Sequence, residues 1–178
     1  MARLITRIED EISPQYAELS YPLLGNPTFN VGTIKGGAQV NFVADQCRIA
    51  IDCRLIPGQT PEGVVEGFKE VIARATAEDD ALDAAVEDPF FVCAALGTDE
   101  DAHIVSSAAE ACRAVLGEAT ISGVPYATDG SPFSARGVPT IVLGPGSIDQ
   151  AHGAVEWVDC QQVLQAVDIY QQIMQHCD

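Results

Sequence analysis

The chain of 178 residues is 47% hydrophobic, which is enough to bury a core in one large domain or two small ones. Its 26 acidic and 9 basic residues give a formal net charge of -17, and a surface of this sign repels phosphate backbones and anionic membranes. The composition therefore argues against binding to nucleic acids and to membrane surfaces.

The apolar segments and the start of the chain give no sign of membrane insertion or export. The longest apolar run, residues 138–143, falls far short of the roughly 20 residues that a spanning helix needs. Arg3 and Arg7 follow Met1 without the apolar core of a signal peptide. We therefore expect a soluble, cytoplasmic protein.

The first elements in chain order are a helix and two strands. Residues 2–12 repeat aliphatic side chains at helical spacing, and Pro14 is expected to interrupt this helix because proline lacks a backbone donor. A strand is predicted from Thr28 to a turn at Gly36. In residues 46–54, apolar and polar side chains alternate, which predicts a strand with one buried face.

A strongly indicated helix begins after Thr60. This residue offers an N-cap hydroxyl, Pro61 suits the first helical position, and Glu62 complements the helix dipole. We then expect a strand over residues 84–92 and a helix over residues 102–116, which a glycine ends.

The last third of the chain alternates between strands and helices. Residues 121–127 and 138–143 are predicted buried strands, with a short helix between them. The closing helix is predicted over residues 159–176, where Asp159 and Gln162 form a capping box. Its predicted buried face consists of Val163, Leu164, Val167, Tyr170 and Met174.

The six cysteines show no C-x-x-C pair and no zinc-knuckle spacing. Most lie on apolar stripes of predicted elements, where a thiol behaves as a small hydrophobic group. We therefore expect reduced, structural thiols in a reducing compartment. The residues are Cys47, Cys53, Cys93, Cys112, Cys160 and Cys177.

The segment GPGSIDQAHGAVEW, residues 144–157, follows a predicted buried strand, and ligands collect beyond the carboxyl ends of such strands. Gly144 and Gly146 allow close backbone approach to a ligand or positive φ, and Pro145 stiffens the loop. His152 would there be a suitable ligand for zinc or a similar divalent ion. From chemistry alone an exposed loop histidine is the alternative, since one histidine cannot make a metal site.

The string GPGSIDQAH, followed by Glu156, resembles the C-terminal signature of the metallopeptidase family that includes acetylornithine deacetylase, succinyl-diaminopimelate desuccinylase and aminoacylases. Of these, acetylornithine deacetylase is the most similar. The resemblance implies that His152 ligates one of two catalytic divalent ions, Zn²⁺ or in some cases Co²⁺. It also implies a role in amino-acid biosynthesis, specifically of arginine.

Residues 26–62 resemble the lid domain of that family. Asn41 and Arg54 match positions that reach the substrate, although Ala44 stands where the family usually has proline. An arginine fork can clamp a carboxylate, and an asparagine can hydrogen-bond a polarised amide oxygen. The alternatives are a solvated arginine and a turn-forming asparagine.

Residues 126–146 resemble the stretch that follows the lid. This likeness places Thr128 and Asp129 at the rim of the substrate site, together with Gly144 and Gly146 as substrate-binding positions. The alternative for Asp129 is an ordinary N-cap of the short helix.

The resemblance implies an α/β (α+β) fold in two parts. Residues 1–92 would be a ferredoxin-like lid and dimerisation domain, and residues 93–178 the C-terminal part of an α/β catalytic domain. In the family, a strand precedes the helix that residues 2–12 match. Without this central strand, two neighbouring strands would lack a partner.

The resemblance also implies a function that this chain does not complete. The other metal ligands and the general base of the family lie upstream of the lid, and no residue here matches them. We expect the C-terminal part of a two-metal hydrolase that deacylates N-acyl amino acids, with N-acetylornithine, N-succinyl-diaminopimelate or a relative as substrate. The chain alone is expected to be inactive, with no catalytic residue of its own, and to form a homodimer through the lid.

Two other functions fit the sequence. One is a non-catalytic module that dimerises or assembles with a separately encoded N-terminal half. The other is a thiol-dependent hydrolase that pairs Cys160 or Cys93 with His152, which is disfavoured because neither cysteine has an electropositive, helix-start setting. His103 and His176 are expected at the surface.

Overall fold

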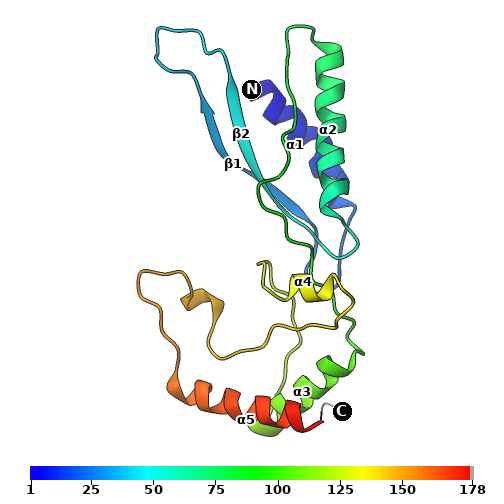
Figure 1. Cartoon of the computed structure of the whole chain (residues 1–178), viewed down its shortest axis with the longest axis vertical. Helices are drawn as coiled ribbons and strands as arrows, with labels where there is room; N and C mark the ends of the chain where they lie inside the picture. The colour runs from blue at the N-terminus through cyan, green and yellow to red at the C-terminus, as the bar shows by residue number, and fades with distance from the viewer. Residues whose placement is uncertain (177–178) are drawn as a thin grey trace. The chain divides into compact units, whose positions relative to one another are not determined.

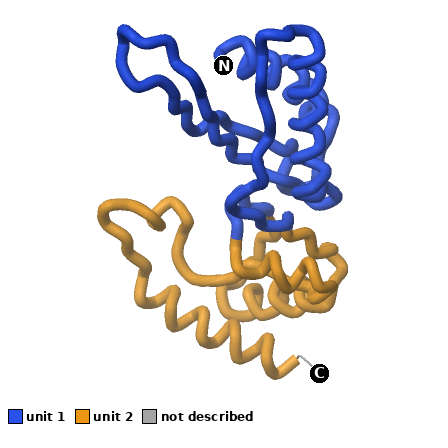
Figure 2. The backbone as a smooth tube through the Cα atoms, turned by 45° about the horizontal axis from the view of Figure 1, so that its top comes forward, with its two compact units in different colours: residues 1–95, 123–127 blue, residues 96–122, 128–178 orange. Residues whose placement is uncertain are grey.

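The computed structural model describes residues 1–176 and divides into two compact units. Figure 2 shows them as residues 1–95 with 123–127, called the first unit, and residues 96–122 with those from 128 onward, called the second unit. The fold is α+β, as predicted, with helices and one small antiparallel sheet. Within the described residues no helix has the length and hydropathy to cross a membrane.

The first unit has the element order α1, β1, β2 and α2, which spans Ala2–Ala17, Thr28–Gly36, Cys47–Arg54 and Pro61–Glu78. The two strands pair as an antiparallel hairpin in which Thr28 lies opposite Arg54 and Gly36 opposite Cys47. Thr60 caps α2 as predicted, because its hydroxyl accepts a hydrogen bond of 3.1 Å from the Gly63 N–H.

The core of the first unit lies between the two helices and one face of the hairpin (Figure 1). Its buried residues are Leu4, Ile8 and Ile12 from α1 and Phe68, Val71, Ile72 and Ala75 from α2. The Phe29 ring from β1 stands edge-on to Tyr16 and Phe68, with centroids 5.8 and 5.9 Å away. Cys53 of β2 packs against this core, and burial raises the pKa of its thiol to about 11. That thiol therefore stays protonated at neutral pH.

The prediction that Pro14 interrupts the first helix is wrong, because α1 continues through it to Ala17. An internal proline removes one helical hydrogen bond and costs roughly 3 kcal/mol. Packing offsets this cost, since the extra turn brings the Tyr16 ring onto Phe29. The Gln15 side chain, next to Pro14, also donates a hydrogen bond of 2.8 Å to the Glu11 carbonyl.

The predicted strand over residues 84–92 is also wrong. Leu82, Ala84 and Val86 pack against the core, but residues 84–92 form no backbone hydrogen bond with any other described residue. A strand needs a neighbour that pairs with its backbone. In residues 1–176 β2 pairs with β1 alone, so its other edge has no strand beside it.

The second unit contains α3 at His103–Leu116, α4 at Ser131–Ser134, the 3-10 helix η1 at Ile148–Gln150, and α5 at Cys160–His176. Gly117 ends α3 as predicted, with a left-handed φ of 84°. Helix α3 packs against α5. The side chains that α5 buries are Ala166 and Ile169.

The predicted strands over residues 121–127 and 138–143 are not formed, and both segments are irregular. One pair of hydrogen bonds resembles strand pairing. The Thr140 N–H donates to the Thr98 hydroxyl at 3.2 Å, and that hydroxyl donates to the Thr140 carbonyl at 2.5 Å. Short apolar runs are typical of buried strands, but they become strands only beside a partner. The part of the chain that the structure describes offers these runs none.

The predicted buried face of α5 is wrong as well. All five side chains named for it are exposed, from Tyr170 at 39% to Leu164 and Met174 at 68%. The capping box is only half formed, because the Asp159 carboxylate accepts from the Gln161 N–H at 2.7 Å while the Gln162 side chain turns away. Helix α5 therefore faces α3 with a different stripe from the one its sequence indicates.

Candidate functional site

The Gly-Pro-Gly segment of the second unit is fastened to α5. Gln162 of α5 accepts a hydrogen bond of 2.9 Å from the Gly146 N–H, and the Tyr170 hydroxyl donates one of 2.7 Å to the Leu143 carbonyl. Gly146 has a left-handed φ of 89°, and a Cβ there would approach Val158 to 3.3 Å. The backbone conformation at position 146 therefore requires glycine. The Gly146 N–H is already bonded to Gln162.

His152 comes shortly after η1 and has an unusual backbone conformation. Its φ is 59°, in the left-handed region that non-glycine residues rarely adopt, at a cost of roughly 1–2 kcal/mol. The His152 N–H donates a hydrogen bond to the Glu156 carboxylate. The residue is exposed, and its imidazole makes no hydrogen bond with the other residues of the described range. Its ring is therefore free to act as a ligand.

The metal that the sequence implies can be tested against this donor set. No cluster of three or more His, Cys, Asp and Glu side chains with metal-binding geometry occurs in residues 1–176. A zinc site has four protein ligands, or three protein ligands and a water molecule. His152 therefore fits one position of a coordination shell, and the rest of the described chain does not complete that shell.

The remaining predicted residues of the second unit lie just before α4. The Thr128 hydroxyl accepts a hydrogen bond of 3.2 Å from the Gly130 N–H, which shapes the turn into this short helix. Asp129 is exposed, and its carboxylate has no hydrogen bond with residues 1–176. The N-cap of α4 is Gly130, so the capping alternative for Asp129 is wrong.

Arg54, the last residue of β2, does not present a free guanidinium fork. Its Nε donates to an Asp52 carboxylate oxygen at 2.7 Å, and its Nη1 donates to the Pro125 carbonyl at 3.5 Å. All three residues belong to the first unit. Arg54 thereby fastens the 123–127 segment to the end of β2, and a ligand carboxylate would compete with Asp52 for its fork.

Asn41 lies in a turn at the tip of the hairpin, where the Phe42 N–H donates to the Gln39 carbonyl at 3.1 Å. Its carboxamide is exposed and has no hydrogen bond within the described range. Val40 and Val43 on either side are almost fully exposed. The turn-forming alternative therefore describes its backbone, while its side chain is available to a ligand.

Sequence reasoning missed three residues that shape these positions: Asp52, Glu156 and Gln162. Asp52 was visible only as part of the charged face of a strand. Gln162 was assigned to a helix cap, and its actual partner Gly146 is 16 positions away. No predicted site residue forms a hydrogen bond with another in the described chain. The expectation that neither candidate thiol lies at a helix start is wrong for Cys160, which is the first residue of α5, but neither Cys93 nor Cys160 bonds a histidine in the described residues.

Comparison with known proteins identifies part of the chain. Residues 1–80 match the peptidase dimerisation domain of the M20 class. The confirmed resemblance extends beyond this domain, because an acetylornithine deacetylase of Aliivibrio fischeri is 32% identical over 156 residues, which cover 85% of this chain and 38% of the relative.

A second acetylornithine deacetylase, from Vibrio campbellii, is 27% identical over 172 residues, which cover 94% of this chain and 42% of the relative. The chain thus spans about two fifths of the length of these relatives. Among solved structures, an M20 family metallo-carboxypeptidase from Sulfolobus solfataricus matches with a TM-score of 0.59 and 19% identity. This match covers 97% of the present chain and 44% of the carboxypeptidase, and it supports the fold.

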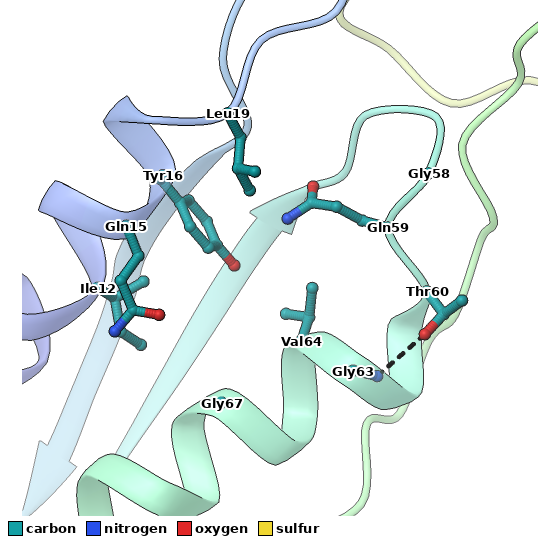
Figure 3. Close-up of a pocket in the computed structure, with 10 residues that line it drawn as sticks. All are labelled: Ile12, Gln15, Tyr16, Leu19, Gly58, Gln59, Thr60, Gly63, Val64 and Gly67. Atoms are coloured by element: carbon teal, nitrogen blue, oxygen red, sulfur yellow. Dashed lines mark hydrogen bonds between the residues drawn. The ribbon is translucent and has the colours of Figure 1, made fainter.

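The first unit also contains a cleft of about 310 Å³ between α1 and the start of α2 (Figure 3). None of the predicted site residues lines it. Figure 3 shows the Tyr16 hydroxyl and the Gln59 amide directed into it, beside Val64. Burial raises the pKa of Tyr16 to about 12, and the lining has no carboxylate or imidazole. This cleft of the first unit therefore lacks groups for acid–base chemistry near neutral pH.

Proposed function

We propose that this chain supplies the lid and part of the catalytic unit of a metal-dependent hydrolase that deacylates N-acyl amino acids. The match of residues 1–80 to a peptidase dimerisation domain and the similarity to acetylornithine deacetylases support this function. The observation that carries it is the His152 loop. This loop offers an exposed imidazole, free of hydrogen bonds within the described residues, beside a Gly-Pro-Gly segment that α5 holds.

In this proposal His152 is one ligand of a two-ion site that holds Zn²⁺ or Co²⁺. Such ions polarise an amide carbonyl and lower the pKa of a bound water when the site is complete. The other ligands and the general base come from polypeptide outside these 178 residues, because the described chain does not complete a coordination shell. We therefore propose that the chain alone is inactive.

The substrate contacts that we propose are those implied by the family resemblance. Arg54 binds the carboxylate of the amino acid once the ion pair with Asp52 opens, and Asn41 donates a hydrogen bond to the amide oxygen. Thr128 and Asp129 line the rim. Gly144 and Gly146 let the substrate approach the backbone because neither has a Cβ. The Gly146 N–H donates to Gln162 and is not a donor for the substrate.

The first test is genetic. The DNA upstream of codon 1 is expected to encode an H-x-D motif and a pair of adjacent glutamates, in the same or a shifted reading frame. Co-expression of that product with this chain should restore hydrolysis of N-acetylornithine or N-succinyl-diaminopimelate in the presence of Zn²⁺ or Co²⁺. His152→Ala should abolish it, with His103→Ala as the matched control because His103 lies exposed on α3.

The isolated chain provides the complementary measurement. Purified and supplied with either ion, it should hydrolyse neither substrate above the rate of its His152→Ala variant, since one imidazole does not form a hydrolytic site. Turnover by the chain alone that disappears in His152→Ala would show that it holds a complete site, against the proposal.

A second candidate function is a non-catalytic assembly module, and the exposed face of α5 favours it. The five apolar side chains of that face are the ones an amphipathic helix normally buries. An exposed apolar stripe of this kind is typical of a protein interface. Sedimentation and activity assays of the co-expressed products separate the candidates: an assembly that hydrolyses an N-acyl amino acid supports the enzyme, and a stable assembly without any activity supports the module.

A further inference from the structure

We infer that Glu156 is a positioning residue that fixes the direction of the His152 imidazole by holding the His152 backbone in its left-handed conformation. The contact that carries this inference is the hydrogen bond from the His152 N–H to the Glu156 carboxylate. The inference rests on the proposed role of His152, but the contact is a property of the chain without any metal.

The backbone of His152 needs such support. Among residues 1–176, only Leu23 and His152 combine a side chain with a positive φ. In this conformation the Cβ crowds the following carbonyl, so a free loop would return to an ordinary φ and point the ring elsewhere. Side-chain direction follows the backbone, and any group that locks φ at His152 therefore also aims the imidazole.

Glu156 has the right chemistry to hold the His152 backbone. Its carboxylate accepts the N–H across a loop of five residues, and a hydrogen bond to an ionised acceptor is roughly twice as strong as one between neutral groups. No arginine, lysine or histidine side chain pairs with Glu156 in the described part of the molecule. Its observed interaction is with the loop alone.

The rest of the loop is held independently, which isolates the contribution of Glu156. Before His152, the Ser147 hydroxyl accepts from the Asp149 N–H at 3.3 Å and so caps η1. Gln162 fixes Gly146 at the start of the loop. Neither contact reaches His152, so the loss of Glu156 should release the histidine without unfolding the second unit.

The experiment measures the backbone of His152 in the metal-free, isotope-labelled chain of 178 residues. Nuclear magnetic resonance couplings at the His152 amide and Cα report its φ, and amide hydrogen exchange reports its hydrogen bond. Wild type, Glu156→Ala and Glu156→Gln are compared. Glu118→Ala serves as the matched control, because Glu118 is an exposed carboxylate without a hydrogen bond in the described residues.

Glu156→Ala should speed exchange of the His152 amide by about tenfold and move its couplings to values typical of negative φ. Glu156→Gln should retain most of the protection, since its carboxamide oxygen accepts the same bond. Both variants should keep the thermal midpoint of the wild type, which a purely structural role would lower. Unchanged couplings and exchange at His152 in Glu156→Ala would overturn the inference.

These outcomes are independent of the metal. If His152→Ala retains activity in the co-expressed assembly, the role of His152 fails, and the couplings still decide whether Glu156 sets its backbone. If the couplings stay unchanged while His152→Ala is inactive, the proposed function stands and the positioning role of Glu156 is wrong.

Discussion

The guanidinium of Arg54 donates through Nε to the carboxylate of Asp52, 2.7 Å away and two residues earlier on the same face of β2. Successive side chains of a strand alternate between faces, so residues 52 and 54 lie next to each other on the same face. Both side chains are about half exposed, and exposed ion pairs are weak. The pair can therefore open for a ligand at low cost.

Asp52→Asn should increase the affinity of the assembled enzyme for its substrate, because it leaves the Arg54 fork without a competing carboxylate. We expect KM to fall by about two- to fivefold with kcat little changed, the range that an exposed ion pair permits. Steady-state kinetics on the co-expressed assembly provide the measurement. Asp45→Asn is the control, since Asp45 lies near the hairpin tip without an ion pair in the described residues.

Arg54→Lys should have the opposite effect and raise KM, since an ammonium group cannot form the two parallel hydrogen bonds of a guanidinium fork. If Asp52→Asn and Arg54→Lys both left KM at the wild-type value, Arg54 would not contact the substrate, and the pair would serve only to fasten the 123–127 segment through Pro125.

Helices α1 and α2 are joined by an ion-pair network that should make the first unit sensitive to acid. Arg7 bonds Glu78 with both Nη atoms at 2.5 and 2.9 Å and Glu11 at 2.6 Å, and Arg74 bonds Glu11 at 2.7 Å. Hydrogen bonds from Arg74 and Arg7 lower the pKa of Glu11, and one from Arg7 lowers the pKa of Glu78.

Because these pKa values are lower in the folded state, the network stabilises the protein above the ordinary carboxyl pKa of 4.5, and this contribution is lost as pH falls through the lowered values. Thermal unfolding between neutral and acidic pH measures the effect. The midpoint of Glu78→Gln should fall less on acidification than that of the wild type. Glu9→Gln, an exposed α1 residue outside the network, should behave like the wild type, and identical pH profiles for all three would contradict the prediction.

The two sides of α5 should respond to substitution in opposite ways. Ile169 is buried, so Ile169→Ala should lower the free energy of unfolding by about 2–4 kcal/mol. Leu164 is 68% exposed, so Leu164→Lys should change it by less than about 0.5 kcal/mol in the isolated chain. Urea unfolding checks both values. A large loss in Leu164→Lys would mean that the predicted face of α5 is buried after all.

The same Leu164→Lys variant tests the assembly function. It should weaken capture of the upstream product if the exposed face of α5 is the contact surface, because a lysine there would place a charge in an apolar interface. Glu110→Lys on α3 is a suitable control for the added charge, since Glu110 is already exposed.

The elements that sequence predicted correctly are those whose signals are local. Thr60 and Pro61 mark the start of α2, the alternation of residues 47–54 marks β2, and Gly117 ends α3. Each of these depends on neighbours within a few positions. The predicted strand at residues 138–143 failed for the opposite reason: its apolar composition says that it suits a sheet, but not whether a partner lies beside it.

The candidate site shows the same division. The motif GPGSIDQAH identified the loop that carries His152, and the position of Arg54 at the end of a strand was correct. The hydrogen bonds from Arg54 to Asp52 and from Gly146 to Gln162 could not be predicted, because both depend on side-chain rotamers in the folded state. Nor could the left-handed φ of His152, since sequence normally signals such a backbone with glycine or asparagine.

His152→Gly should stabilise the chain, because glycine adopts a φ of 59° without the crowding that a Cβ causes. After the greater entropy of glycine in the unfolded chain is subtracted, we expect a gain of about 0.5–1 kcal/mol in the free energy of unfolding. His152→Ala keeps the Cβ and should show no gain. Urea unfolding of the three proteins without metal gives the comparison, and a destabilised glycine variant would mean that the histidine side chain contributes contacts absent from this structure.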